Sequence, residues 1–402
     1  LSSLNDVKRH KRLPTSVRLA FMALLRTDIG SLAVTLPGLG VYLFDHGNPG
    51  PQADIKVKDL RMVTDVLLHG DIGFANAYMA DQFETSDLTA VLEFFAVNFE
   101  KAGALGRGNK LKNLLVKLVD SLTRQNTKRG SKQNILAHYD LGNAFYEKWL
   151  DPTMTYSSAI YEGQEDIVTA QNRKYDAIAR SLGAKPGDHI LEIGSGWGGF
   201  AEYAAKTYGS KITTITISNA QHEYARERIF KAGLTEQVDV RLCDYRDVEG
   251  SFDGVASIEM FEAVGESFWP GYFDKLSGVL KEGKRAALQI ITIDDELFDG
   301  YRNRVNFIQK YIFPGGMLPS EAVLKEQFDR AGLVYESAQM FGASYAETLR
   351  VWAENFRRFW PEIQTLGFDK GFRNLWEYYL CYCEAGFKTG RTDVGHFVLR
   401  KP

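Results

Sequence analysis

The stretch that most restricts the fold of this chain is 189–200, which reads His-Ile-Leu-Glu-Ile-Gly-Ser-Gly-Trp-Gly-Gly-Phe. Its apolar start is typical of a buried strand, and a helical run follows the glycines at 200–207. Glycines at a strand-to-helix turn let bare backbone approach a ligand, and the helix N-terminus attracts negative charge. The stretch therefore predicts a nucleotide-type ligand site, with a glycine turn that binds nothing as the alternative.

Strands and helices alternate on either side of this turn. The expected strands are 190–193, 211–217, 238–242, 254–258 and 285–292, and the expected helices between them are 201–207, 221–231 and 272–280. Such alternation is typical of a doubly wound, mostly parallel sheet. We therefore expect an α/β fold with a Rossmann-like sheet as the catalytic domain, over residues 135–402, with an insertion at 294–320.

Residues 1–100 are expected to form a separate, small α+β domain. The chain of 402 residues is long enough for two or three domains. Within this first part, 30–44 alternates like strands, 46–51 is a turn cluster, and 86–99 has helical spacing. No pattern in it indicates catalysis.

The linker at 101–134 carries most of the positive charge. Residues 101–132 contain nine basic side chains and one acidic side chain, although the net charge of the chain is −3. Leucines recur at helical spacing between Leu111 and Leu122, with lysines on the other faces. This pattern predicts a basic amphipathic helix that either contacts an anionic membrane surface or packs on a neighbouring domain.

Three cysteines are too few for a disulfide framework, and this favours a reducing compartment. No apolar run reaches the roughly 18 residues that a membrane span needs, and the basic start does not resemble a signal peptide. We therefore expect a cytoplasmic protein, peripheral at the inner face of the membrane. We expect no metal site and no nucleic-acid partner, and leave a homodimer open.

The strand ends decide between two nucleotide ligands. A dinucleotide site needs an acid after the second strand, but 216–221 reads Thr-Ile-Ser-Asn-Ala-Gln. This disfavours NAD, while the amide of Gln221 can still bond a ribose hydroxyl. Asp244-Tyr245-Arg246-Asp247 follows the third strand, where an acid and an aromatic ring can read adenine, although an ordinary charged turn fits equally. Glu259 and Glu262 follow the fourth strand and are candidates for the ligand crevice.

Several short motifs occur in a fixed order and carry a family resemblance. They are Tyr156-Ser157, the glycine loop, 216–221, 244–247, Phe261-Glu262, 310–316 and 341–345. Together they resemble the cyclopropane-fatty-acyl-phospholipid synthases, which use S-adenosylmethionine (SAM), and Glu192 before the glycines resembles the first motif of SAM methyltransferases. The resemblance covers roughly 137–400. It also implies an N-terminal lipid-binding domain over 1–100.

The resemblance implies a site for SAM beside the glycine loop. The expected cofactor residues are Tyr156, Ser157, Glu192, Gly194, Ser195, Gly196, Trp197, Gly198, Thr216, Ser218, Gln221, Asp244, Tyr245, Arg246 and Glu259. The implied reaction is attack of a cis double bond of a phospholipid acyl chain on the methyl group of SAM. A base then removes a proton and a ring closes. Aromatic side chains can stabilise the cation formed between these steps.

In the family that this chain resembles, the base is a bound bicarbonate in a pocket made by Glu, Tyr, His and Cys. Glu262 and Tyr345 match that Glu and Tyr, whereas Ser158 stands for the Cys and Gln289 for the His. Serine and glutamine can bond an anion but do not titrate near pH 7 as histidine does. We therefore expect Glu262 and Tyr345 to flank a small anion. Cys383 matches another family cysteine and is a structural residue by default.

The function expected from this resemblance is transfer of a methyl or methylene group from SAM to an unsaturated phospholipid, with a cyclopropane fatty acid as the product. The residues Ser158 and Gln289 motivate a second possibility, a methyl- or methylene-branched product without ring closure. A third interpretation, from another class, is a lipid-binding protein whose methyltransferase domain is inactive.

Overall fold

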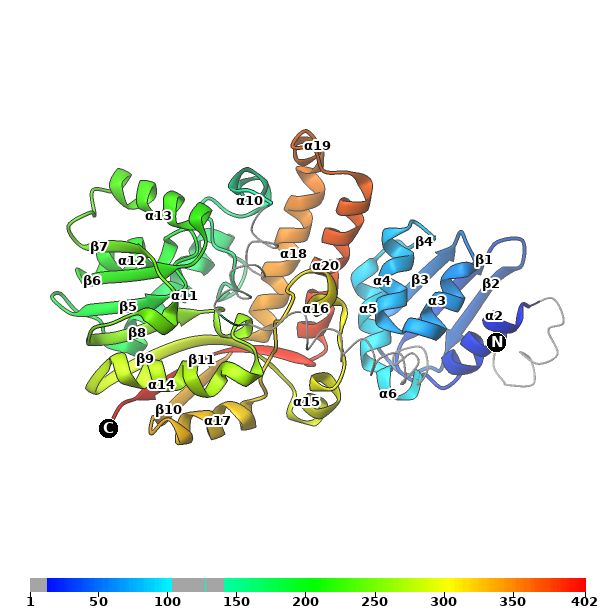
Figure 1. Cartoon of the computed structure of the whole chain (residues 1–402). Coiled ribbons are helices and arrows are strands. Elements are labelled where there is room, and N and C mark those ends of the chain that lie inside the picture. The colour runs from blue at the N-terminus through cyan, green and yellow to red at the C-terminus, as the bar shows by residue number, and fades with distance from the viewer. Residues whose placement is uncertain (1–12, 103–126, 128–140) are drawn as a thin grey trace.

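The computed structural model describes residues 13–102, 127 and 141–402. Figure 1 shows a small N-terminal unit beside a larger α/β unit, with the long helices α18 (Gly342–Arg358) and α20 (Lys370–Lys388) between them. The chain starts in the small unit, and its C-terminal strand lies in the large sheet.

The N-terminal unit is a four-stranded sheet covered by helices. Its strands are β1 (Ser31–Leu36), β2 (Gly40–Asp45), β3 (Gln52–Val57) and the short β4 (Phe83–Glu84), in the order β2-β1-β3-β4. Its helices are α2 (Thr15–Leu24), α3 (Arg61–His69), α4 (Asp71–Met79), α5 (Leu88–Val97) and α6 (Phe99–Ala102). In β1 every second side chain is buried, because one face of the sheet packs on the helices.

The larger unit contains the mostly parallel sheet that the sequence predicts. Its strands are β5 (His189–Ile193), β6 (Lys211–Thr216), β7 (Val238–Leu242), β8 (Phe252–Ile258), β9 (Leu280–Ile293), β10 (Val334–Met340) and β11 (Thr392–Arg400). They lie in the order β10-β11-β9-β8-β5-β6-β7. Strands β5 to β9 pair in parallel, whereas β11 is antiparallel to both β9 and β10. The predicted doubly wound α/β fold is confirmed.

Helices cover both faces of this sheet, and the predicted helices between the strands are present. They are α12 (Gly199–Tyr208), α13 (Asn219–Lys231) and α14 (Trp269–Val279), and α11 (Ile167–Leu182) and α17 (Glu321–Arg330) also belong to this unit. The predicted insertion contains α15 (Asp295–Arg302) and α16 (Phe307–Tyr311), and α10 (Asn143–Trp149) and α19 (Trp360–Gln364) lie near the long helices. Residues at the ends of β5, β6 and β8 and residues of this insertion line one cavity.

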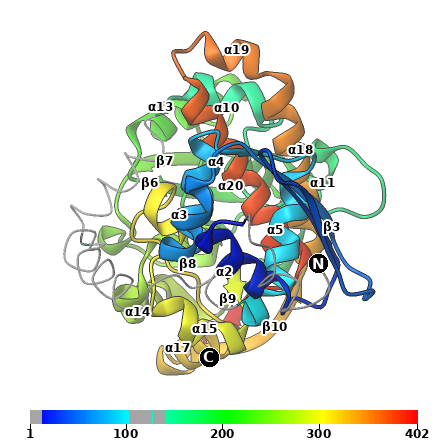
Figure 2. The same cartoon turned by 90° about the vertical axis from the view of Figure 1, so that its right-hand side faces the viewer.

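The two units share one apolar core. Buried side chains of the N-terminal sheet and helices belong to the same cluster as those of α18 and α20. Figure 2 shows α4 and α5 in front of α20 when the molecule is viewed from the N-terminal side. Polar contacts reinforce the packing: Thr89 Oγ1 donates to Glu384 Oε2 at 3.0 Å, and Tyr311 Oη donates to Asn76 Oδ1 at 2.6 Å.

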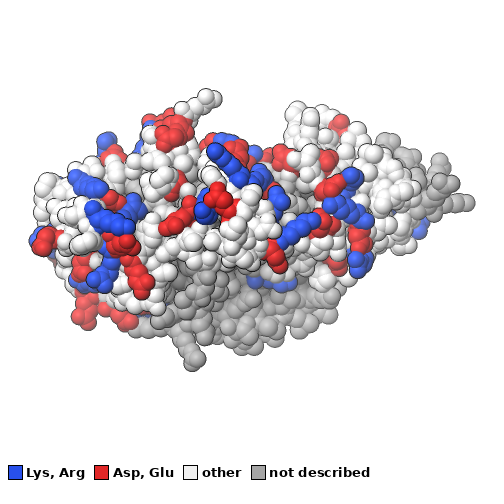
Figure 3. All heavy atoms as spheres, turned by 90° about the horizontal axis from the view of Figure 1, so that it is seen from above, with Lys and Arg blue, Asp and Glu red and all other residues white. Residues whose placement is uncertain are grey.

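The predicted basic amphipathic helix, between Leu111 and Leu122, lies outside the described residues. Among the described residues, no helix combines the length and the apolarity that crossing a membrane requires. Figure 3 shows one face of the molecule, where acidic and basic side chains of the described part are interspersed. The charge of that face therefore does not single out a binding surface of one sign.

Candidate functional site

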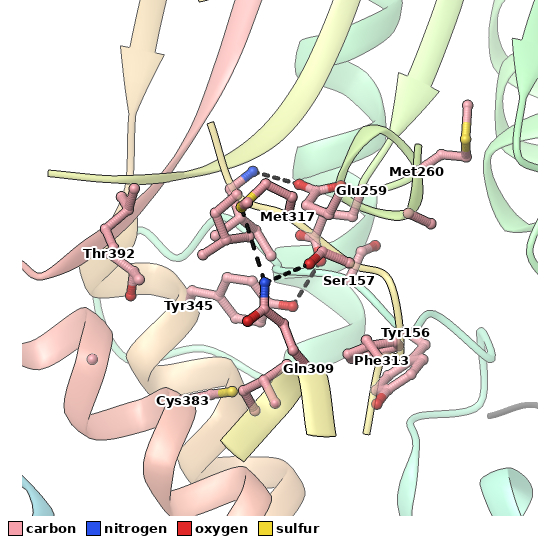
Figure 4. Close-up of a pocket in the computed structure, with 18 of the residues that line it drawn as sticks. Tyr156, Ser157, Glu259, Met260, Gln309, Phe313, Met317, Tyr345, Cys383 and Thr392 are labelled. Carbon is pink, nitrogen blue, oxygen red and sulfur yellow. Dashed lines mark hydrogen bonds between the residues drawn. The ribbon is translucent and has the colours of Figure 1, made fainter. Parts of the chain in front are cut away.

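A cavity of about 990 Å³ begins at the glycine loop and reaches the N-terminal unit. It is lined at one end by residues that follow β5, β6, β7 and β8, and at the other by apolar side chains of α4 and α5, such as Phe74, Leu92 and Phe95. Figure 4 shows Tyr156, Glu259, Tyr345 and Cys383 around this pocket, although they come from four separate parts of the chain. Thirteen of the fifteen expected cofactor residues line it, and Gly198 and Ser218 do not.

The glycine loop presents bare backbone to the cavity. Gly196 has φ of +48°, and a Cβ atom built there would meet no atom within 4 Å. Gly199 is glycine because of close packing: a Cβ there would collide with the hydroxyl of Tyr175 on α11. The loop is therefore held close to α11 on one side and leaves room for a ligand on the other.

Side chains at the end of β6 orient Gln221 so that its amide N–H group can donate to a ribose hydroxyl. Thr216 Oγ1 donates to Gln221 Oε1 at 3.0 Å, so the amide carbonyl of Gln221 is fixed and its Nε2 group is available for a hydroxyl. The Ser218 hydroxyl accepts from Gln221 N at 3.3 Å and caps α13. Ser218 therefore supports the site without lining it.

The acid after β7 is paired with its own neighbour. Arg246 donates from Nε to Asp244 Oδ1 at 2.8 Å and from Nη2 to Asp244 Oδ2 at 2.7 Å. The guanidinium also lies 5.3 Å from the centre of the Tyr245 ring. An adenine in this part of the cavity would meet a neutralised Asp244–Arg246 pair rather than an isolated carboxylate.

A buried lysine that the sequence analysis missed contacts Ser157, one of the expected cofactor residues. Lys174 is fully buried and donates to Ser157 Oγ at 2.7 Å, and burial lowers its pKa to about 7. Near it, Glu192 Oε2 accepts from Thr214 at 2.6 Å, and burial raises the pKa of Glu192 to about 8. The sequence signal was a lysine on the buried face of α11, at helical spacing from Ile178.

The Glu259 carboxylate is held by three hydrogen-bond donors. Its Oε1 accepts from Ser158 N at 2.8 Å and from Gln289 Nε2 at 2.7 Å, and its Oε2 accepts from Tyr345 Oη at 2.7 Å. Burial raises the pKa of Glu259, and the hydrogen bond from Tyr345 opposes that shift. Tyr345 therefore donates to Glu259, whereas the sequence analysis expected Tyr345 and Glu262 to flank a small anion.

Glu262 lies in the same cavity with fewer partners. Its Oε1 accepts from Ile291 N at 2.6 Å, and its buried Oε2 has no partner among the described residues. Burial, and then the charge of Glu259, raise the pKa of Glu262 to about 8. The two carboxyls thus differ in their partners, because three donors contact Glu259 and one contacts Glu262.

The expected bicarbonate does not fit between these residues. Ser158 reaches Glu259 through its backbone N–H, while its hydroxyl donates to Ala159 O at 2.9 Å. Gln289 and Tyr345 also direct their donors at Glu259, so all three are engaged by a carboxylate of the chain. Cys383 lines the cavity, and burial raises the pKa of its thiol well above the ordinary value, which keeps it protonated.

The remaining walls of the cavity are largely apolar and aromatic. The aromatic residues that line it include Phe313, Tyr345, Tyr378 and Tyr379. Tyr379 Oη lies 2.7 Å from Tyr156 Oη. Among the described residues, no cluster of His, Cys, Asp and Glu could hold a metal ion. The arrangement joins a nucleotide-type loop, two carboxyls and an aromatic chamber.

Known proteins match this chain over most of its length. The family described as mycolic acid cyclopropane synthetase matches residues 126–397. The tuberculostearic acid methyltransferase of Mycobacterium tuberculosis is 38% identical over 340 residues, which cover 82% of this chain and 79% of that protein. A cyclopropane-fatty-acyl-phospholipid synthase of Escherichia coli is 34% identical over 365 residues, covering 88% and 89%.

Solved structures agree with these relatives. The cyclopropane synthase MmaA2 from Mycobacterium tuberculosis has a TM-score of 0.64 and 28% identity, and the match covers 67% of this chain and 98% of that one. A mycolic acid cyclopropane synthase in complex with SAH and CTAB has a TM-score of 0.63 and 27% identity, with the same coverage. The chain therefore belongs to the mycolic acid cyclopropane synthetase family, and it is a methyltransferase whose cofactor is SAM.

Proposed function

We propose that this protein transfers a methyl or methylene group from SAM to the double bond of an unsaturated phospholipid acyl chain. The observation that carries the proposal is the single cavity that joins the glycine loop at Gly196 to apolar side chains of the N-terminal unit. A long apolar chain can occupy the aromatic part while SAM occupies the loop. The names of the relatives, a fatty acid methyltransferase and a phospholipid synthase, support this substrate class.

SAM would supply an electrophilic methyl group. The residues of the chain would hold the alkene, exclude water and stabilise the charge that develops. The walls of the cavity hold the alkene near the methyl group and exclude water, because an alkene is a weak nucleophile and needs close orientation. The π electrons of the double bond form the new C–C bond, and the neighbouring carbon becomes positive. Aromatic faces such as Phe313 and Tyr379, and the carboxylate of Glu259, stabilise that charge.

The first product that we propose is a cyclopropane fatty acid, which forms when a base removes a proton from the new methyl group at once. A second candidate is a methyl or methylene branch, which forms when a hydride shift precedes the loss of the proton. Ser158 and Gln289 motivate this second route, because neither side chain titrates near pH 7 as histidine does. A saturated methyl branch would need a separate reductase to supply hydride.

Product analysis separates these candidates. Incubation of the protein with methyl-labelled SAM and vesicles of oleoyl phospholipid is expected to place label in the fatty acids. Proton NMR of the released methyl esters then distinguishes cyclopropane methylene protons from methyl or exocyclic methylene protons. Boiled protein is the control. Absence of label from every unsaturated phospholipid tested would contradict the proposed function.

We also propose that the basic linker brings the enzyme to an anionic membrane, at the inner face in the cytoplasm. Each lysine near such a surface contributes about 1 kcal/mol, and salt screens that attraction. Replacing Lys110, Lys112 and Lys117 by glutamate is therefore expected to weaken binding to anionic vesicles strongly and to neutral vesicles little. Sedimentation with vesicles at low and high salt measures this effect, and SAM affinity should not change. Equal partitioning of variant and wild type would assign membrane contact to another surface.

A further inference from the structure

The backbone at Glu259 is unusual for a glutamate. Its φ is +50°, in the left-handed region that glycine adopts most easily, and among the described residues only Asp81 and Met154 share this feature without being glycine. Met154 also lines the cavity. This conformation is strained for a non-glycine residue, and such strain is retained mainly where surrounding contacts enforce it, often at functional sites. Here the three hydrogen bonds to the Glu259 carboxylate hold its backbone in this conformation.

The three donors to this carboxylate come from separate parts of the fold. Ser158 N belongs to the segment before α11, Gln289 lies on β9 and Tyr345 on α18. Donors that converge in this way form a site for an anion. The anion in this structure is a side chain of the protein itself.

A neighbouring histidine, His396, fixes the orientation of the Gln289 side-chain amide. His396 Nε2 lies 2.8 Å from Gln289 Oε1. Burial and the charge of Lys174 lower the pKa of His396 to about 3, so this imidazole is neutral. Because the Gln289 oxygen can only accept, His396 must donate from Nε2, and the amide NH₂ group of Gln289 then faces Glu259. His396 and Gln289 are positioning residues for this carboxylate.

We propose that Glu259 takes the place of a small bound anion, and that its carboxylate accepts the proton in a reaction that requires no bicarbonate. This inference rests on the proposed function. In the first step the π electron pair forms the C–CH₃ bond, and the S–CH₃ pair stays on sulfur. In the second step Glu259 Oε2 takes a proton from the alkylated chain. The C–H pair becomes the third ring bond or a new double bond, and the proton later passes to water.

Glu259 is better suited to this role than Glu262. The three donors stabilise its charged form, whereas Glu262 has one donor and lies near a negative charge. Among the described residues, Oε2 of Glu259 accepts one hydrogen bond, from Tyr345, so it keeps a lone pair for a proton. The hydrogen bonds therefore stabilise a carboxylate at Glu259 more than at Glu262.

Two substitutions at Glu259 test the proposal against the wild type. E259G suits the left-handed backbone and leaves the three donors around an open space, whereas E259Q fills the space without a charge. D81G is the matched control for a new glycine, because Asp81 has φ of +56° and is exposed on the N-terminal unit. Methyl transfer from SAM to dioleoyl-phosphatidylglycerol vesicles is measured in buffer freed of carbon dioxide, with and without added bicarbonate or formate.

We expect the wild type and D81G to turn over at the same rate with and without either anion. Both Glu259 variants should lose about 100-fold or more in rate, the usual contribution of a general base. Bicarbonate or formate should restore part of the rate of E259G and none of that of E259Q. A wild-type rate that rises several-fold with bicarbonate, or an E259G rate equal to the wild type without an anion, would overturn the proposal.

A readout without substrate keeps this test separate from the proposed function. Formate should raise the melting temperature of E259G and not that of the wild type or E259Q, because an anion that binds only the folded state stabilises it. If the wild type methylates no lipid but this shift is present, the anion site stands and the proposed substrate fails. If the lipid is methylated and formate neither stabilises nor rescues E259G, the role of Glu259 is refuted while the proposed function stands.

Discussion

Replacing Gly196 by valine is expected to abolish SAM binding while the protein stays folded. A Cβ atom at this position meets no protein atom within 4 Å, so a larger side chain would project into the space proposed for the cofactor. The cavity wall here is backbone, which cannot move aside as a flexible side chain can. We expect affinity to fall by at least about 100-fold, roughly 3 kcal/mol, as measured by calorimetry.

The same substitution at Gly332 is the matched control. Gly332 has φ of +69°, and a Cβ there also meets no atom within 4 Å, but the residue does not line the cavity. Valine at either position suffers the strain of a left-handed backbone. Only the Gly196 variant should lose SAM. Wild-type affinity in a folded Gly196→Val protein would mean that SAM lies elsewhere.

The fold and the ligand loop could be predicted because their signals are local. The alternation of apolar strands with helical runs specifies a parallel sheet, and the glycines after Ile193 specify a strand-to-helix turn with room for a ligand. The absence of an acid after β6 also told against NAD, and the relatives that match the chain are methyltransferases.

The choice between Glu259 and Glu262 could not be made from the sequence. The two glutamates are three residues apart, which would place them on one side of a regular helix. The structure instead has a left-handed residue at Glu259 and a short 3₁₀ turn at Phe261–Ala263, so the two side chains have different partners. Tyr345 lies 86 residues away from Glu259, and only the tertiary fold, in which α18 packs on α20 and β11, brings its hydroxyl there.

The packing of the N-terminal unit on the larger unit could not be predicted from the sequence either. The sequence analysis treated 1–100 as a separate domain, and nothing in its spacing shows that α4 and α5 pack on α20. That packing depends on apolar faces of three helices that are distant in sequence, and it adds Phe74 and Leu92 to the cavity walls. Lys174 was missed for a related reason, since a lysine is normally a surface residue.

Replacing Glu262 by glutamine is expected to change how stability depends on pH. The pKa of Glu262 is about 8 in the folded protein, against an ordinary value of 4.5. A raised folded pKa means that this group's contribution to stability is fully present below pH 4.5 and is lost as the pH rises towards 8. The loss is at most about 1.4 kcal/mol per pH unit for one proton. Glutamine cannot titrate, so the variant gains stability relative to the wild type between pH 5 and pH 8.

Denaturant unfolding of both proteins at several pH values measures this difference, and Glu326→Gln, at an exposed position on α17, is the control. The same Glu262→Gln variant should bind SAM nearly normally but turn over about 100-fold more slowly. The ionised form of Glu262, which accumulates as the pH rises towards 8, would stabilise the cation that forms on the lipid. The wild-type rate should therefore rise with pH up to about 8, whereas the rate of the variant should not. A variant within a few-fold of the wild-type rate would remove Glu262 from the reaction and leave Glu259 as the only carboxylate that acts.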